Sequence, residues 1–347
     1  MEKKESLFLR LLLPLDEKVS VKLLLRVWGP RFEFAVRLIL VATFLDDSFR
    51  AATSFSEHTK QLGEQAWLVW LAVASPELVS GIATVALSIG LLAQLLGSLC
   101  LLALVQPDAA TKALIGWAVA QPVLYSQTTN LEFVAESLSL VGGLLMLRAA
   151  LQLKDLKANR DSGGGSAPDG AARACARTQL FGRLLLPAVY MYHTGHLLFS
   201  LFDHSLSMFV VNCAVLVGLA LGCTLMAAGL KSRTVALSLA LVNLVFVCYQ
   251  HPFFGSVWRE GAASKFVGEV DPFVEWKLRK SMPHVAMPMD ISAPDFEPWQ
   301  ITDLHRYYFF QGLSASGALL LLAQFGPGEI AVQEDEVLLP VVQRAQD

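Results

Sequence analysis

The acidic residues beside two apolar segments are the first candidates for chemistry. Asp46, Asp47 and Arg50 are close enough in sequence that, on a helix, the arginine can reach either carboxylate. Glu132 and Glu136 are four residues apart and therefore share one helix face. Together these side chains would form an electronegative pocket suited to a cationic group, such as an amine or a peptide N-terminus. The alternative is that charges at helix ends reach the membrane interface and pair locally.

The helix that must hold the two aspartates has an unusual charge spacing. Only the apolar run Leu38 to Leu45 separates Arg37 from Asp46. At 1.5 Å per residue this run covers roughly 12 Å, whereas the hydrocarbon core of a bilayer is about 30 Å thick. A spanning helix at this point must therefore carry a charge inside the membrane, which indicates a functional or a pairing role.

The composition predicts a membrane protein. Of the 347 residues, 54% are hydrophobic and 16% are charged, and the apolar residues form long blocks. The net charge of -3 is spread along the chain, so no basic face exists for nucleic acid. The five cysteines form no CxxC pair, which argues against disulfide and thiol redox chemistry. No Walker loop, dinucleotide fingerprint, GxSxG elbow or zinc-protease motif is present, and we predict a protein that is not an enzyme.

We predict an all-α fold, a polytopic membrane protein with eight transmembrane helices. The predicted spans cover residues 31–54, 78–105, 109–127, 131–151, 180–202, 205–230, 234–254 and 304–324. Ser75, Pro76 and Glu77 are a cap, a first-turn proline and a first-turn acid, which predicts a helix start. The apolar piece 67–74 is too short to span, and we interpret it as interfacial or re-entrant.

The two halves of the chain resemble each other, which predicts two parallel four-helix repeats. The matched segments are Arg37–Leu40 with Arg183–Leu186, Glu136–Ser139 with Gln311–Ser314, and Gly142 with Gly317. The predicted organisation is a cytosolic interfacial segment (1–31), a first repeat (32–153), a flexible cytosolic linker (154–178), a second repeat (179–325) with a luminal loop (255–304), and a cytosolic tail (326–347).

Charge predicts the orientation of this arrangement. With the N-terminus inside, sixteen Lys and Arg residues lie in inner segments and eight lie in outer ones. An excess of basic residues on the cytosolic side is typical of membrane proteins, so both termini are predicted to be cytosolic. The acidic pocket and the loop 255–304 then face the lumen.

Other polar residues are predicted to have structural roles. Glu33 and Arg37 are four residues apart and would pair near the cytosolic end, and Arg183 is interpreted in the same way from the repeat. His193 and His196 are three apart, but the seven histidines are scattered. We therefore predict no metal site and no cofactor.

With these residues in view, the chain resembles the surfeit locus protein 4 family of endoplasmic-reticulum cargo receptors. The segments that carry the resemblance are Arg37–Leu38, Thr43–Asp47, Arg50, Leu95–Gly97, Gly142–Leu145, Gly182–Leu185, Leu230–Arg233, Tyr308–Gln311 and Gly326–Gly328. They occur in the order found in the family.

The resemblance implies a receptor of the endoplasmic-reticulum membrane that cycles to the Golgi. Such a receptor binds the N-terminal region of soluble secretory cargo in the lumen and engages the COPII vesicle coat in the cytosol. Family members commonly end in a di-lysine retrieval signal, which the ending Arg344–Asp347 does not contain.

We place the cargo site at the acidic pocket, a hypothesis that the resemblance itself does not establish. Carboxylates would accept the ammonium group of a cargo N-terminus, and apolar side chains would contact the residues behind it. The candidate residues are Asp46, Asp47, Arg50, Tyr125, Asn130, Glu132 and Glu136.

Two other classes of protein remain alternatives. A small-molecule or lipid transporter is also built from tandem repeats with charged groups near the membrane midplane. A membrane oxidoreductase with four-helix units is a third possibility, and the absence of a luminal cysteine pair argues against it.

Overall fold

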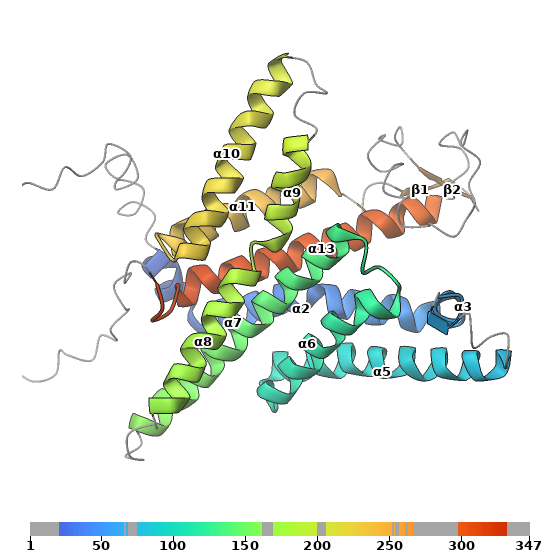
Figure 1. Cartoon of the computed structure of the whole chain (residues 1–347), viewed down its shortest axis with the longest axis horizontal. Coiled ribbons are helices and arrows are strands. Elements are labelled where there is room, and N and C mark those ends of the chain that lie inside the picture. Colours follow the sequence, from blue (N-terminus) through green and yellow to red (C-terminus); the bar gives the residue numbers. More distant parts are fainter. Residues whose placement is uncertain are drawn as a thin grey trace, which may run out of the picture.

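The computed structural model describes residues 21–65, 67–68, 75–161, 169–199, 206–251, 253, 257–260, 263–266 and 298–331. Helices make up most of this part of the chain (Figure 1). They are α2 (Val21–Thr53), α3 (Phe55–Gly63), α5 (Pro76–Ala103), α6 (Pro107–Leu124), α7 (Leu131–Asp161), α8 (Asp169–Leu185), α9 (Ala188–Phe199), α10 (Leu206–Ala228), α11 (Ser232–Gln250) and α13 (Pro298–Phe325).

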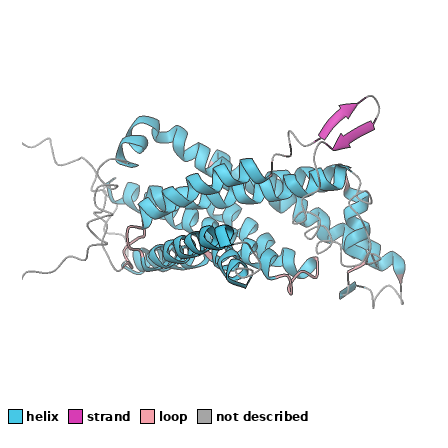
Figure 2. Cartoon of the chain, turned by 90° about the horizontal axis from the view of Figure 1, so that it is seen from above, coloured by secondary structure: helices cyan, strands magenta, loops and turns pink. Residues whose placement is uncertain are grey.

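The predicted luminal loop contains the strands found in the described residues. Strands β1 (Val257–Glu260) and β2 (Ala263–Phe266) pair antiparallel, with Val257 opposite Phe266. Figure 2 shows this hairpin projecting from one end of the helical bundle, where β2 contacts α13. Apart from the hairpin, the described chain is helical, as predicted.

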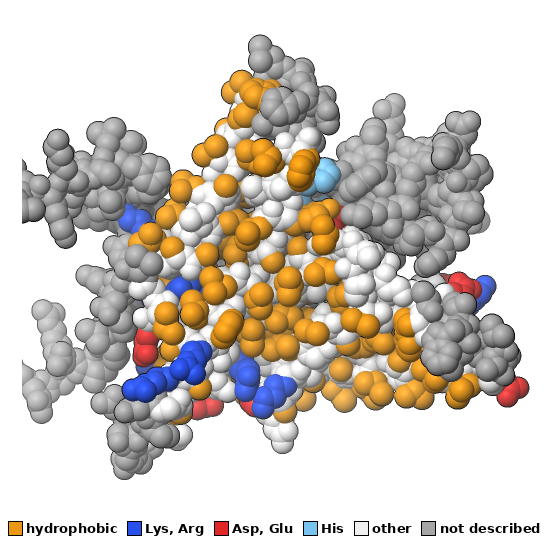
Figure 3. Space-filling view, viewed as in Figure 1, with side chains coloured by type: hydrophobic (Ala, Val, Ile, Leu, Met, Phe, Trp, Pro, Cys, Tyr) orange, Lys and Arg blue, Asp and Glu red, His pale blue; other side chains and the backbone are white. Residues whose placement is uncertain are grey.

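Five helices within the described residues are long and apolar enough to cross a membrane. They are Glu77–Ala103, Leu131–Asn159, Phe209–Ala228, Ser232–Gln250 and His305–Phe325. Hydrophobic side chains cover much of the face seen in Figure 3. Large apolar residues such as Ile89 on α5 and Val245 on α11 are exposed, which suits contact with lipid. The chain is therefore a multi-pass membrane protein.

Some helix boundaries follow from local sequence. The predicted start of α5 is confirmed, because the Ser75 side chain accepts a hydrogen bond from the backbone N–H of Leu78 at 3.3 Å. Helix α2 begins earlier than predicted, at Val21. It is kinked at Gly29, which has a non-helical φ of 37° and lies directly before Pro30. Of the apolar piece 67–74, residues 69–74 lie outside the described part of the chain.

Two boundaries differ from the prediction. The sequence predicts a flexible linker over 154–178, yet α7 continues to Asp161 and α8 begins at Asp169, while residues 162–168 of the predicted linker lie outside the described part of the chain. Leucine, alanine, lysine and arginine in these stretches favour helix. The predicted fifth span is divided between α8 and α9 at Pro187, which lacks an N–H and cannot continue the helix before it.

Helices α2, α7 and α13 form the centre of the bundle (Figure 1). Helix α13 packs against α2, α7 and α11. Their facing side chains are fully buried, including Leu40 and Phe44 on α2, Leu144 on α7 and Leu319 on α13. The polar residues described below lie on these same helices.

Two glycines let helix backbones approach closely. A Cβ atom on Gly142 would lie 2.6 Å from the backbone nitrogen of Leu186, and one on Gly317 would lie 2.6 Å from that of Leu40. Real Cβ atoms do not come so close to backbone atoms, so only glycine fits at either position. These four residues occupy positions that the sequence repeat matches.

Two serines bridge the same pairs of helices. Ser139 Oγ accepts a hydrogen bond from the backbone N–H of Val189, and Ser314 Oγ accepts one from that of Thr43, both at 3.0 Å. Each serine hydroxyl also donates to a backbone carbonyl of the partner segment. The contact of α7 with the α8–α9 junction therefore occurs again between α13 and α2.

Asp108 attaches the start of α6 to α7 and carries a pH-dependent prediction. It accepts hydrogen bonds from Lys112 Nζ and Arg148 Nε, each at 2.6 Å, and these bonds lower the pKa of the carboxyl. When the pKa of a carboxyl is lower in the folded than in the unfolded protein, the ionised group stabilises the fold at pH values above the unfolded pKa of about 3.9. That stabilisation is lost as pH falls through the folded pKa.

We expect Asp108→Asn to reduce the free energy of unfolding by up to about 1 kcal/mol at pH 7. Thermal unfolding in detergent should show the difference shrinking toward pH 3. An unchanged difference at pH 3 would contradict this role.

Candidate functional site

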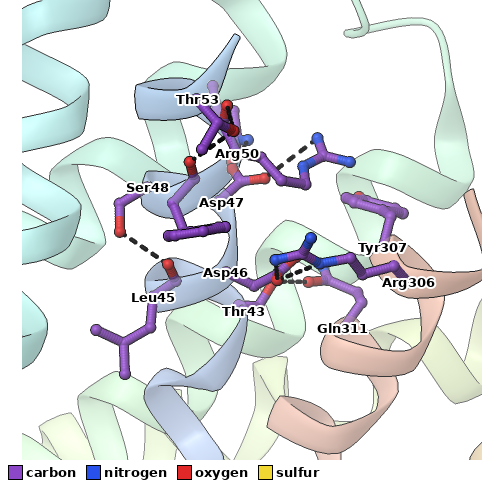
Figure 4. A network of polar contacts seen from close by, with 12 residues as sticks. Thr43, Leu45, Asp46, Asp47, Ser48, Arg50, Thr53, Arg306, Tyr307 and Gln311 are labelled. Carbon is purple, nitrogen blue, oxygen red and sulfur yellow. Dashed lines mark hydrogen bonds and ion pairs between the residues drawn. The ribbon is translucent and has the colours of Figure 1, made fainter. Parts of the chain in front are cut away.

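Asp46 is bound by an arginine from the far end of the sequence. Its Oδ1 atom accepts a hydrogen bond from Arg306 Nε at 2.6 Å, which joins α2 to α13 (Figure 4). The Asp46 side chain is 6% exposed and the Arg306 side chain 29%. The guanidinium also lies 5.6 Å from the ring centre of Phe49. The first predicted carboxylate is therefore neutralised by a close, largely buried ion pair.

Asp47 is held more loosely than Asp46. Gln121 Nε2 on α6 donates to its Oδ2 atom at 3.0 Å, and Arg50 lies 3.6 Å from its Oδ1 atom. Figure 4 shows Arg50 extending toward Tyr307, whose ring centre is 6.0 Å from the guanidinium carbon. An ionised carboxylate can accept about four hydrogen bonds, so Asp47 retains acceptor capacity.

The two glutamates on α7 lie on the same buried surface. Tyr307 donates a hydrogen bond to Glu136 Oε2 at 3.1 Å, and both Glu132 and Glu136 are buried. Both glutamates are close enough to Tyr192 on α9 and Tyr308 on α13 to interact electrostatically with their side chains. Residues 306–308 of α13 therefore connect the acids of α2 with those of α7.

A small polar cavity lies beside Asp47, between α2, α5, α6, α7 and α13. Thr43 Oγ1 donates to Gln311 Oε1 at 2.9 Å on one wall. The cavity is lined by Thr43, Phe44, Asp47, Gln94, Gln121, Phe133, Ser137, Leu140, Tyr307 and Gln311. It combines one carboxylate and several neutral polar groups with aromatic surface.

Two further predicted site residues lie at the edge of this region. Tyr125 directly follows the last residue of α6 and is close enough to Asp47 and Arg50 to interact with them electrostatically. Asn130 precedes α7 and donates a hydrogen bond to Gln127 Oε1 at 3.2 Å. The structure thus assigns Tyr125 to the surroundings of Asp47 and Asn130 to a local turn.

The predicted pairing residues Glu33 and Arg37 lie on α2, away from the acids, and Arg183 lies on α8. Glu33 accepts hydrogen bonds from Lys154 at 2.6 Å, so its short contact is with Lys154 rather than with Arg37. Arg37 is buried. Arg183 is also buried and donates to the backbone carbonyls of Pro327 and Ile330 at 2.7 and 2.8 Å. It therefore holds the segment after α13 against α8.

The described residues contain no group of three or more His, Cys, Asp and Glu that could hold a metal ion. The two predicted histidines, His193 and His196, lie beside Tyr192. The Nδ1 atoms of His251 and His305 are 3.2 Å apart, which requires a hydrogen bond with at least one ring neutral.

Sequence reasoning missed Arg306, Tyr307, Gln121 and Gln94. Arg306 lies near the start of the predicted last span, residues 304–324, and α13 already begins at Pro298. Its ion pair joins residues 260 positions apart, a distance over which helical spacing predicts no contact. The only available signal was the position of Arg306 two residues before Tyr308–Gln311, a segment that carries the resemblance.

Comparison with known proteins identifies the family of the chain. The sequence model of the SURF4 family matches residues 22–266, more than half of the chain. The chain is also similar to the surfeit locus protein 4 homolog of Drosophila melanogaster, with 24% identity over 300 residues, 86% of this chain and 87% of the relative. No solved structure matches it. The family match covers the helices that carry Asp46, Asp47, Glu132 and Glu136, and the chain belongs to the SURF4 family.

Proposed function

We propose that this protein is a transmembrane receptor that binds soluble secretory proteins in the lumen of the endoplasmic reticulum and recruits them to vesicles bound for the Golgi. It would act by binding and not by catalysis. Membership of the SURF4 family supports this proposal, as does the multi-pass helical fold.

The convergence of four acids, of which Asp46, Glu132 and Glu136 are buried, is the observation that carries the proposal. Asp46, Asp47, Glu132 and Glu136 come from two helices and meet around residues 306–308 of α13. Burying several carboxylates costs free energy unless they are paired, and charged groups within membrane segments are typically functional. A luminal group of acids is suited to the ammonium of a cargo N-terminus.

We also propose that the bundle consists of two parallel four-helix repeats with eight spans. The repeated serine and glycine contacts support this arrangement, since they join residues matched in the two halves. Both termini would be cytosolic, as the distribution of Lys and Arg indicates. The vesicle coat would then engage the cytosolic segments, while the acids face cargo.

A small-molecule or lipid transporter is the second candidate, and the polar cavity beside Asp47 favours it. Transporters place such cavities between repeats near the membrane midplane. The two functions differ in what occupies the cavity, a protein segment or a small molecule.

Secretion measurements test the receptor proposal. Cells that lack the protein would be supplied with wild type, Asp47→Asn or Glu136→Gln, and their secreted soluble proteins quantified by mass spectrometry. We expect each variant to reduce secretion of the dependent proteins about tenfold or more, because a charge-assisted contact to the cargo is lost.

Asp108→Asn is the matched control, since it also neutralises one acid but lies at the other end of α6. Receptor abundance in the membrane must be equal for all variants. If secretion of every soluble protein stays unchanged in Asp47→Asn and Glu136→Gln cells, the receptor site is assigned wrongly.

A further inference from the structure

Helix α8 has two arginines on an exposed face. Arg173 and Arg177 are both exposed and lie about one helical turn apart. Phe181 and Leu184 continue the same side of the helix and are 59% and 46% exposed. One stripe of α8 therefore changes from positively charged to apolar along the helix.

The contact of α8 with α7 gives the depth of these arginines. Cys175 Sγ donates a hydrogen bond to the carbonyl oxygen of Ala149 at 3.0 Å, so Arg173 and Arg177 lie on either side of the level of Ala149. At 1.5 Å per residue, α7 extends roughly 27 Å from Leu131 to Ala149, close to the ~30 Å of the hydrocarbon core. The arginines therefore lie near one membrane surface when the start of α7 lies at the other.

Phe181 and Leu184 lie deeper in the membrane than the arginines. Their neighbour Gly182 packs against Gly142, because a Cβ on Gly182 would lie 2.8 Å from the carbonyl oxygen of Gly142, toward the middle of α7. Figure 3 shows Lys and Arg side chains over the lower part of α7 and α8, with hydrophobic side chains next to them. Positive charge at headgroup depth followed by apolar surface fits a phospholipid with an anionic headgroup.

The two arginines have no partner among the described residues. Neither forms an ion pair or a side-chain hydrogen bond there. Asp169 lies four positions before Arg173, whereas no acid lies within four positions of Arg177 in the sequence. Other basic residues of these helix ends are already bound, Lys112 and Arg148 by Asp108 and Lys154 by Glu33. The face of α8 is therefore the part of this end that is open to an anion.

We infer that this face of α8 binds an anionic phospholipid. Arg173 and Arg177 bind the headgroup phosphate, and Phe181 and Leu184 contact an acyl chain. A guanidinium presents a planar fork of N–H donors that matches phosphate oxygens. A soluble anion would use only the charged part of the face. The lipid lies in the cytosolic leaflet, which carries anionic lipids, and this placement, unlike the binding itself, rests on the proposed orientation.

Native mass spectrometry of the purified full-length protein tests the binding. The protein in detergent would be titrated with phosphatidylinositol, or with phosphatidylcholine of the same acyl chains, and the lipid-bound fraction measured. We expect tighter binding of phosphatidylinositol. Arg177→Gln should weaken it about fivefold, because one basic residue contributes about 1 kcal/mol at an anionic membrane surface. Adding Arg173→Gln should weaken it further.

Lys60→Gln is the matched control. Lys60 is also exposed but lies on α3, and its substitution removes the same charge. It should leave the binding of phosphatidylinositol unchanged. Equal binding of the two lipids, or an equal loss in Lys60→Gln and Arg177→Gln, would overturn the inference. Complete displacement of the lipid by inorganic phosphate at the same concentration would also overturn it, because the acyl chain would then contribute nothing.

Glycosylation mapping tests the leaflet separately. Gly164→Asn creates an Asn-x-Ser acceptor between α7 and α8, and Arg279→Asn creates one in the predicted luminal loop. We expect a glycan on Arg279→Asn and none on Gly164→Asn. A glycan on Gly164→Asn would overturn the cytosolic placement together with the orientation that the receptor function needs, while lipid binding in detergent would still hold.

Discussion

Gly317→Leu is expected to abolish the packing of α13 against α2, and Gly317→Ala to reduce the free energy of unfolding by about 1–3 kcal/mol. A Cβ at this position would lie 2.6 Å from the nitrogen and 2.9 Å from the Cα of Leu40. These are backbone atoms inside a helix, so neither can move without shifting the helix. Thermal unfolding in detergent, followed by tryptophan fluorescence, measures the loss for Gly317→Ala, and the folded yield after purification measures it for Gly317→Leu.

Gly116→Ala is the matched control for this prediction. Gly116 lies inside α6 and a Cβ there would meet nothing within 4 Å. Alanine is a better helix former than glycine, so this change should stabilise the protein by up to about 1 kcal/mol. If Gly317→Ala proves as stable as Gly116→Ala, α2 and α13 do not approach as closely as described.

Arg306→Leu is expected to have the next largest effect, a loss of about 2–4 kcal/mol in the free energy of unfolding. The substitution would leave the Asp46 carboxylate, 6% exposed, without its guanidinium partner. Removing one partner of a buried ion pair typically costs 3–5 kcal/mol. We place the effect slightly lower because the Arg306 side chain is 29% exposed and water can partly replace it. Thermal and chemical unfolding of the purified protein measure the change.

The double variant Asp46→Asn with Arg306→Leu tests whether this loss comes from the unpaired charge. Asparagine carries no charge, so the double variant should be more stable than Arg306→Leu alone. A positive coupling of roughly 1–3 kcal/mol in the double-mutant cycle is expected. Additive effects of the two substitutions would contradict a direct ion pair between α2 and α13.

The sequence by itself determined the helical membrane class and much of the helix layout. Long apolar blocks exclude a soluble fold, and Ser75 with Pro76 specifies the start of α5 through local hydrogen bonding. The repeated glycines and serines were also visible, because they follow a pattern within each half. Such features depend on neighbouring residues along the chain, and a sequence records those directly.

Only the tertiary structure decided which charges meet. The sequence grouped Asp46 and Asp47 together, yet the fold pairs Asp46 with Arg306 and leaves Asp47 beside a cavity with Gln94. It likewise pairs Glu33 with Lys154, 121 positions away. The physical reason is that a helix end brings several equivalent charges to one depth, and the choice between partners depends on how the helices are rotated and packed. For Asp46 and Asp47, that choice separates the residue that joins two helices from the one that keeps acceptor capacity for a ligand.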